Sequence, residues 1–187
     1  MKILQINSSL LGEHSASIEL SDILTEKLGG DVEVLNTVDF PAIDQVWLAA
    51  SQTSSEQGDV LDLSRRLVES VEAADVIVIG LPVYNFGMPV GLKNWIDTIP
   101  RAGVTFRYTE SGPEGLLASK PVCVVYTAGG VARGSDFDHA SGHLVQVLNF
   151  LGLNDVSFVT ADSLAVDPVG SKSRAQKDIV NVVADLI

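Results

Sequence analysis

The segment DVIVIGLPVYNFGMP, residues 75–89, joins a strongly apolar run to a loop that could hold a flat ring. The run is rich in Val and Ile without polar alternation, which is typical of a parallel strand covered on both faces. Prolines and a glycine bend the backbone after it, and the loop carries Tyr84, Asn85 and Phe86. Because open α/β sheets bind ligands at the carboxyl ends of their strands, the segment predicts a ligand loop beside a central strand.

The rest of the chain alternates between strand and helix patterns. Apolar runs predict strands at residues 2–6, 32–35, 76–80, 122–126 and 156–160. Helical spacing of apolar residues predicts helices over residues 20–28, 60–71, 144–151 and 179–186. Pro89 is placed to open a further helix, and a short helix is expected around Trp47. The alternation predicts one domain, residues 1–187, with a flavodoxin-like, doubly wound, five-stranded parallel sheet of order 2-1-3-4-5.

Composition favours a globular protein and disfavours membrane and nucleic-acid-binding proteins. The 187 residues are 46% hydrophobic and 19% charged, as in globular proteins, and there is no apolar run of membrane-spanning length. The first residues, MKILQINSS, lack the pattern of a signal peptide, so we expect a cytoplasmic protein without a membrane partner. A net charge of −12 disfavours nucleic acid as a partner. The single cysteine, Cys123, lies in the apolar run PVCVVYTA and is expected to be a buried structural thiol.

Hydroxyl groups cluster where the first strand meets the first helix. Ser9 follows the strand, and Ser15, Ala16 and Ser17 stand at the start of the helix. Amides at a helix N-terminus carry partial positive charge, so nearby hydroxyls could complete a phosphate cradle without Lys or Arg. Neither GxGxxG nor GxxxxGK[ST] is present, which favours a monophosphate over a pyrophosphate. The alternative is that Ser15 only caps the helix.

A third loop, TAGG, follows the fourth apolar run, and its paired glycines would let backbone amides approach a ligand. An ordinary strand-to-helix turn is the alternative.

His139 and His143 are four residues apart beside Asp136 and Asp138, but without HExxH or a third ligand we expect a solvated helix end and no metal. Ser-His-Asp hydrolysis remains a minor alternative, since no GxSxG occurs.

The chain resembles the FMN-dependent NADH:azoreductases, flavodoxin-like homodimeric enzymes that are also described as NAD(P)H:quinone oxidoreductases. The resemblance spans almost the whole chain, through KILQINSSL, SASIELSD, DVIVIGLPVYNFGMPVGLKNWID, RAGVTFRYTESGPEGL and LNFLGLNDVSFV. It implies that FMN is held by three groups of residues: Ser9, Ser15, Ala16 and Ser17 at the phosphate, Val83, Tyr84, Asn85 and Phe86 at the isoalloxazine, and Thr127, Ala128, Gly129 and Gly130 at the pyrimidine side.

The resemblance also implies an acceptor pocket lined by Tyr108 and Phe150, partly from the neighbouring subunit of a homodimer. We expect Trp95 and Phe106 to join these residues in an exposed aromatic patch shared by the flavin site and a two-fold interface. Relatives often carry arginine where this chain has alanine in the third loop, so the role of that arginine is lost or moved to Arg133.

The expected activity is electron transfer from NADH or NADPH, through bound FMN, to quinones or azo compounds, with ping-pong kinetics. The cofactor would perform the hydride chemistry, so no catalytic side chain is named and Asn85 is a candidate for tuning the flavin. One alternative is a flavodoxin-like electron carrier, whose docking on basic partners would suit the acidity. Another is an FMN-free binding domain on the same fold.

Overall fold

A computed structural model describes residues 1–51 and 61–187. Its centre is a five-stranded parallel sheet of order β2-β1-β3-β6-β7. The strands are β1 (Lys2–Asn7), β2 (Asp31–Asn36), β3 (Val76–Pro82), β6 (Val122–Thr127) and β7 (Val156–Ala161). All five predicted strands are therefore confirmed, as is the 2-1-3-4-5 order, since β6 and β7 are the fourth and fifth strands of this sheet.

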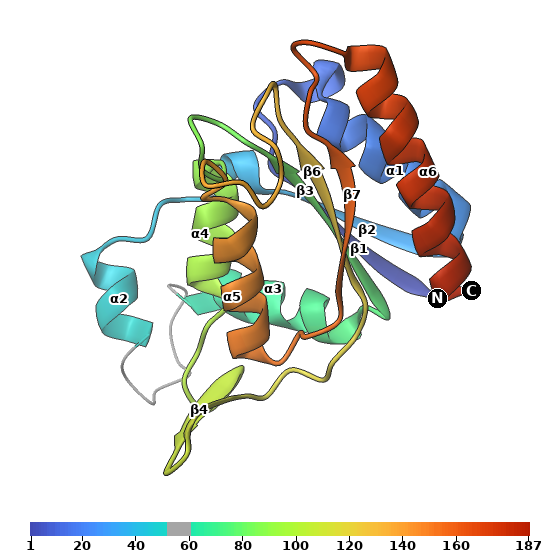
Figure 1. The fold of residues 1–187 in the computed structure, drawn as a ribbon. Helices are drawn as coiled ribbons and strands as arrows, with labels where there is room; N and C mark the ends of the chain where they lie inside the picture. Colours follow the sequence, from blue (N-terminus) through green and yellow to red (C-terminus); the bar gives the residue numbers. More distant parts are fainter. Residues whose placement is uncertain (52–60) are drawn as a thin grey trace.

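Helices cover both faces of the sheet (Figure 1). The first and last, α1 (Ala16–Leu28) and α6 (Pro168–Leu186), lie side by side on one face. The other face is covered by α3 (Asp62–Ala73), α4 (Val90–Thr98) and α5 (Ser141–Leu151). The expected helix around Trp47 is α2 (Gln45–Ser51), and two 3-10 turns are η1 (Gly12–His14) and η2 (Thr37–Asp39). Val60, the first residue of one predicted helical pattern, lies outside the described residues.

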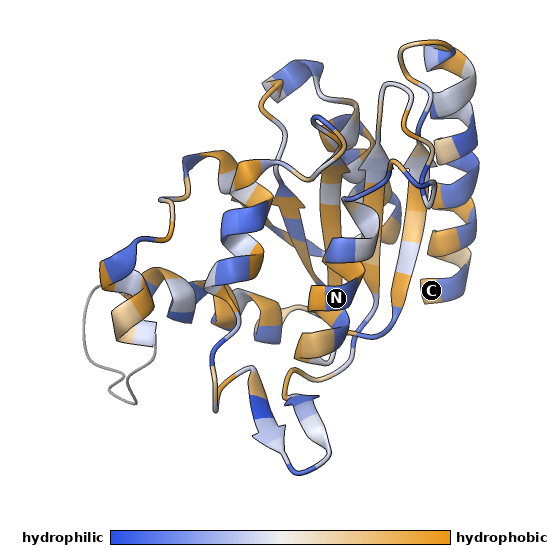
Figure 2. Cartoon of the chain, turned by 60° about the vertical axis from the view of Figure 1, so that its left-hand side comes forward, coloured by the Kyte–Doolittle hydropathy of each residue, from blue (hydrophilic) through white to orange (hydrophobic). Residues whose placement is uncertain are grey.

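The period-two pattern of each central strand divides the core between the two faces. In β3, Val76 and Val78 pack with α1 and α6, whereas Ile77 and Ile79 pack with α3, α4 and α5. Figure 2 shows the apolar strands enclosed between these two helical layers. Cys123 is fully buried in the cluster that contains α1 and α6, as expected, and burial raises the pKa of its thiol.

Trp95 also belongs to the core. The side chain lies on α4 at 0% exposure, packed against the sheet. The expectation that Trp95 forms part of an exposed aromatic patch is therefore wrong, because helical spacing puts it on the same inward face as Leu92 and Ile96.

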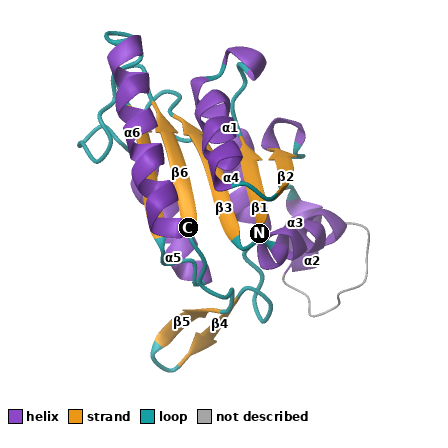
Figure 3. Cartoon of the chain, turned by 90° about the vertical axis from the view of Figure 1, so that its right-hand side faces the viewer, coloured by secondary structure: helices purple, strands orange, loops and turns teal. Residues whose placement is uncertain are grey.

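A two-stranded hairpin projects from the body of the domain (Figure 3). It consists of β4 (Phe106–Thr109) and β5 (Gly112–Gly115), paired antiparallel with Arg107 bonded to Glu114 across the strands. Sequence patterns did not predict it, because each strand has only four residues and β5 reads GPEG. Within the described part of the chain, no helix is long and apolar enough to cross a bilayer.

Candidate functional site

Three loops meet at the carboxyl ends of β1, β3 and β6. The backbone N–H of Val83 donates to the carbonyl of Thr127 at 2.8 Å, which ties the ends of β3 and β6 together. Between the loops is a cleft of about 300 Å³, at the lower end of the range for small-molecule sites. The described residues that line it are Ser9, Leu11, His14, Ser15, Ala16, Pro82, Val83, Tyr84, Thr127, Ala128, Gly129, Leu164 and Lys172.

Eight of the twelve residues predicted to hold the cofactor line this cleft. The other four, Ser17, Asn85, Phe86 and Gly130, lie in the same loops without being among the lining residues. The three loops named from the sequence therefore meet at one cleft, although they are separated by up to about 120 positions in the chain.

In the first loop, Ser15 is the N-cap of α1 and accepts a hydrogen bond from the Ile18 N–H at 3.3 Å. Its hydroxyl also lies 3.0 Å from that of Ser17, which is buried behind it. The N–H groups of Ala16 and Ser17 have no carbonyl four residues back to bind, because they belong to the first turn. Capping by Ser15 and a cradle for an anion are thus compatible at this helix start.

Tyr84 reaches the first loop as well as belonging to the second. Its hydroxyl lies 3.1 Å from Ser9 Oγ and accepts a hydrogen bond from the Leu10 N–H, also at 3.1 Å. Ser9 Oγ in turn accepts from the Leu11 N–H at 3.2 Å. The Tyr84 side chain therefore bridges the loops at the phosphate side of the predicted site, which the sequence did not indicate.

Asn85 and Phe86 occupy a tight turn closed by two hydrogen bonds between the backbones of Tyr84 and Gly87. Both residues have positive φ, 49° for Asn85 and 71° for Phe86. For an aromatic residue this is an unfavourable conformation that surrounding structure must maintain, and such strain concentrates at functional sites. The turn holds the Phe86 ring half-exposed at the carboxyl edge of the sheet.

The loop that leads into α5 supports this turn. The His139 N–H donates to the Phe86 carbonyl at 3.1 Å, and the Phe137 ring lies 6.2 Å from the Phe86 ring. Partial burial disfavours the charged form of Asp138. Hydrogen bonds from Gly134, Ser141 and Ala140 outweigh this effect and lower the pKa of the carboxyl. Asp138 thus fixes the start of α5 and the loop that carries Phe137.

The third loop is held by hydrogen bonds to its own strand and to the segment that follows β7. The Tyr126 hydroxyl donates to the Val131 carbonyl at 3.1 Å, and burial raises the pKa of Tyr126, so it stays protonated. The Ala128 N–H binds Ala161, and the Gly129 carbonyl accepts from Ala165. Both glycines of the pair lack positive φ, so the turn itself does not require them. Gly130 has open space around its Cα, which leaves the loop backbone accessible.

Arg133 does not take the place of the missing arginine in this cleft. Its Nε donates to Thr160 Oγ1 at 3.1 Å, and its guanidinium lies 4.4 Å from the centroid of the Phe158 ring on β7. It is absent from the described lining residues. Lys172, by contrast, does line the cleft, together with His14. The sequence did not place this lysine near the serine loop, because Lys172 lies on α6, far from that loop in the chain.

Tyr108 and Phe150 lie outside the cleft of their own chain. Phe106 contacts both of them, with centroid distances of 5.5 Å to Tyr108 and 4.6 Å to Phe150. The resulting aromatic group stands at the base of the hairpin and the end of α5, and Tyr108 is 76% exposed. Within one chain, these residues are therefore separate from the three loops.

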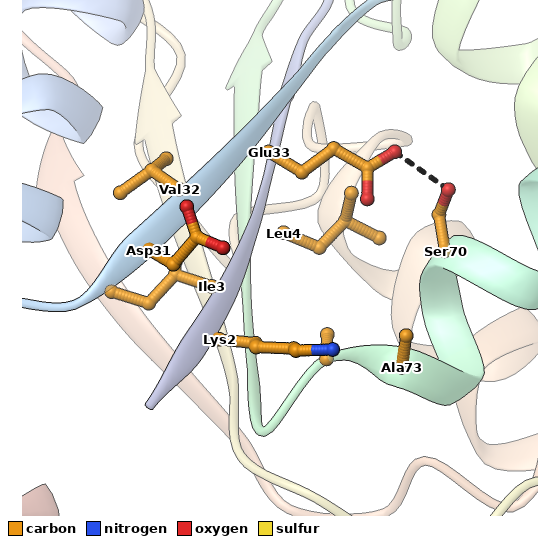
Figure 4. A pocket seen from close by; sticks show the side chains of 9 residues that line it. Lys2, Ile3, Leu4, Asp31, Val32, Glu33, Ser70 and Ala73 are labelled. Carbon is orange, nitrogen blue, oxygen red and sulfur yellow. Dashed lines mark hydrogen bonds between the residues drawn. The ribbon is translucent and has the colours of Figure 1, made fainter.

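A second cleft, of about 220 Å³, lies at the opposite end of the sheet, where β1 and β2 begin (Figure 4). Its charged residues are Lys2, Asp31 and Glu33, and Glu33 is bonded to Ser70 at 2.7 Å. Because ligands of open α/β sheets bind at the carboxyl ends of strands, this cleft is the weaker candidate. Among the described residues, no group of three or more His, Cys, Asp or Glu side chains could hold a metal.

Comparison with known proteins identifies the family. A family model for the flavodoxin-like fold matches residues 1–184. FMN-dependent NADH:quinone oxidoreductase 1 of Jannaschia sp. is 45% identical over 188 residues, covering 97% of this chain and 98% of that protein. This chain belongs to the FMN-dependent NADH:quinone oxidoreductase family. A second member, from Dechloromonas aromatica, is 41% identical and covers 100% of both chains.

A solved structure of an azoreductase is similar to this chain over its whole length. The FMN-dependent NADH-azoreductase of Bacillus anthracis, crystallised in complex with FMN, is 28% identical. It superposes with a TM-score of 0.87 over 99% of this chain and 98% of its own. The resemblance to the FMN-dependent NADH:quinone oxidoreductases and azoreductases is therefore confirmed across the full length of the fold.

Proposed function

We propose that this protein is an FMN-dependent oxidoreductase that transfers electrons from NADH or NADPH to quinones and azo compounds. The observation that carries the proposal is the cleft at the carboxyl ends of β1, β3 and β6, lined by residues from all three loops. Family membership supports the same activity over a flavodoxin-like carrier. The single domain expected over residues 1–187 would contain the whole cofactor site.

The residues of the cleft fit FMN. The first-turn amides of α1 and the hydroxyls of Ser9 and Ser15 offer hydrogen-bond donors to a phosphate, as an anion at a helix N-terminus requires. We infer that Val83, Tyr84, Asn85 and Phe86 flank the isoalloxazine, and that Thr127 to Gly130 meet its pyrimidine side. When bound, FMN would supply the hydride chemistry, while the protein fixes the ring and excludes water.

The substrates would use one face of the site in turn, which predicts ping-pong kinetics. No side-chain acid or base is required for this role, and Asn85 remains a candidate for tuning the ring. The half-exposed Phe86 and the neighbouring Phe137 offer apolar surface to a planar acceptor at the edge of the cleft.

We further propose that the active form is a cytoplasmic homodimer in which Tyr108 and Phe150 complete the partner's acceptor pocket. Their separation from the cleft in their own chain supports a role across an interface, as does the exposed hairpin that carries Tyr108. Light scattering would test the assembly: a fully active monomer would contradict it.

The activity test uses purified protein, FMN, NADH and NADPH with a panel of quinones and azo dyes. The proposal predicts that apoprotein is inactive and takes up FMN in a one-to-one ratio. Without oxygen, the loaded protein should then oxidise about one NADH per FMN when no acceptor is present, and should turn over repeatedly when an acceptor is added. A protein that binds FMN but does not react with either nicotinamide nucleotide would be a carrier. One that takes up no FMN would belong to the FMN-free class.

A further inference from the structure

Lys172 is the one lysine or arginine among the described residues that line the cleft with the predicted phosphate cradle. It lies on the second turn of α6 and lines the cleft beside His14, Ser15 and Ala16. Apart from His14, the other described lining residues are uncharged, so Lys172 brings the one fixed positive charge to this site. The serine-rich loop gives no sign of it, since α6 comes from the far end of the chain.

In the structure, Lys172 Nζ is paired with Glu19 Oε2 on α1 at 2.5 Å. Both side chains are more than a third exposed, at 37% for Lys172 and 48% for Glu19. An ion pair so open to water contributes little stability, because solvent screens it and two long side chains must be ordered. Lys172 can therefore change partners at small cost, and its flexible four-carbon stem allows the movement.

A phosphate monoester is the stronger partner. It carries about −1.5 to −2 charges at neutral pH, against −1 for a carboxylate. The helix N-terminus of α1 offers only about half a positive charge, and the chain as a whole carries −12. A dianion entering this cleft therefore gains from a full positive charge at its edge.

We propose that Lys172 binds the FMN phosphate, and that Glu19 is its resting partner, which it leaves when the phosphate enters. This inference rests on the placement of FMN in the cleft proposed above. It assigns to α6 a part in selecting FMN over riboflavin, which has the same ring and no phosphate.

The test is to titrate apoprotein with FMN and with riboflavin, following the quenching of flavin fluorescence. Lys172→Met should raise the Kd for FMN about 5- to 30-fold, because one charge-assisted hydrogen bond is lost at a position where solvent screens part of its effect. The Kd for riboflavin should stay within about twofold, and Lys172→Arg should restore the preference for FMN. Lys177→Met is the matched control, because Lys177 lies on the same helix but does not line the cleft.

Salt and Glu19 sharpen the test. The effect of Lys172→Met should shrink between about 20 mM and about 0.5 M NaCl, since salt screens charges at the mouth of a cleft. Glu19→Gln should tighten FMN binding about two- to threefold in the parent protein and less in the Lys172→Met background. An equal gain in both backgrounds would mean that Glu19 only repels the phosphate, and would refute the exchange of partners.

A variant of the first loop separates failure of this inference from failure of the site. If Ser15→Ala weakens FMN but not riboflavin while Lys172→Met behaves like Lys177→Met, the cleft holds the phosphate and the role of Lys172 is wrong. Equal weakening of both flavins by Lys172→Met would overturn it as well, because that is the result of a structural defect. If neither Ser15 nor Lys172 affects the choice between flavins, the proposed placement of the phosphate fails.

Discussion

The Tyr84 hydroxyl provides a sharp test of how the second loop organises the first. It lies 3.1 Å from Ser9 Oγ and 3.1 Å from the Leu10 nitrogen, so Tyr84→Phe removes two hydrogen bonds while keeping the ring. Each such bond contributes about 0.5–1.5 kcal/mol, and water can replace part of it at this half-exposed position. A net loss of about 1–1.5 kcal/mol corresponds to a rise of roughly 5- to 10-fold in the Kd for FMN.

The assay is the same titration of apoprotein with FMN and riboflavin. We expect the larger effect on FMN, because the hydroxyl holds the loop around the phosphate rather than the ring. Ser70→Ala is a suitable control, since it also removes a hydroxyl hydrogen bond but at the opposite end of the sheet, against Glu33. Unchanged FMN binding in Tyr84→Phe, or equal weakening of both flavins, would refute this reasoning.

Three further predictions address the surroundings of the site. Asp138→Ala should lower the free energy of unfolding by about 1–2 kcal/mol at neutral pH. Because the folded-state pKa of Asp138 is lowered, this stabilisation is present above its unfolded pKa of about 3.9 and is lost as pH falls through the folded value. The unfolding free energies of the parent protein and of Asp138→Ala should therefore converge when urea melts are repeated in acid. Phe137→Ala removes the ring beside Phe86 and should raise KM for planar quinones about three- to tenfold with FMN affinity unchanged; an unchanged KM would exclude Phe137 from the acceptor surface. Lys120→Met removes three hydrogen bonds to carbonyls at the C-terminal end of α3. It should lower the free energy of unfolding in urea by about 1–2 kcal/mol without changing the Kd for FMN. An unchanged free energy of unfolding would show that water replaces the ammonium group.

The fold followed from local patterns that tertiary packing did not override. The runs of Val and Ile in β3 and β6 show no alternation of apolar and polar residues because both faces are covered. This distinguishes them from the strands of an antiparallel sheet that has one face in water. Pro89 precedes α4 as its N-cap, as the sequence predicted. The hairpin could not be predicted in the same way, because its four-residue strands are held by cross-strand pairs and by Phe106 packing on Phe150, which are long-range contacts.

The three loops that form the cleft could be predicted because each contains residues typical of a ligand loop. Serines at a helix start, a bent aromatic loop and paired glycines all mark loops near the cleft. What the sequence did not reveal depends on side-chain direction between distant elements: Tyr84 turns toward Ser9, and Lys172 arrives from α6. Trp95 was misassigned for a related reason, since an aromatic residue near a binding loop can equally belong to the core.

The central claim is that FMN bound between these three loops carries electrons from a nicotinamide nucleotide to a small acceptor. Anaerobic stopped-flow mixing of the FMN-reconstituted protein with NADH, followed by a second mixing with a quinone, measures the two half-reactions separately. We expect loss of the oxidised flavin spectrum in the first step and its full return in the second, each at least as fast as steady-state turnover. An oxidised flavin that remains unchanged in the presence of either NADH or NADPH would contradict it.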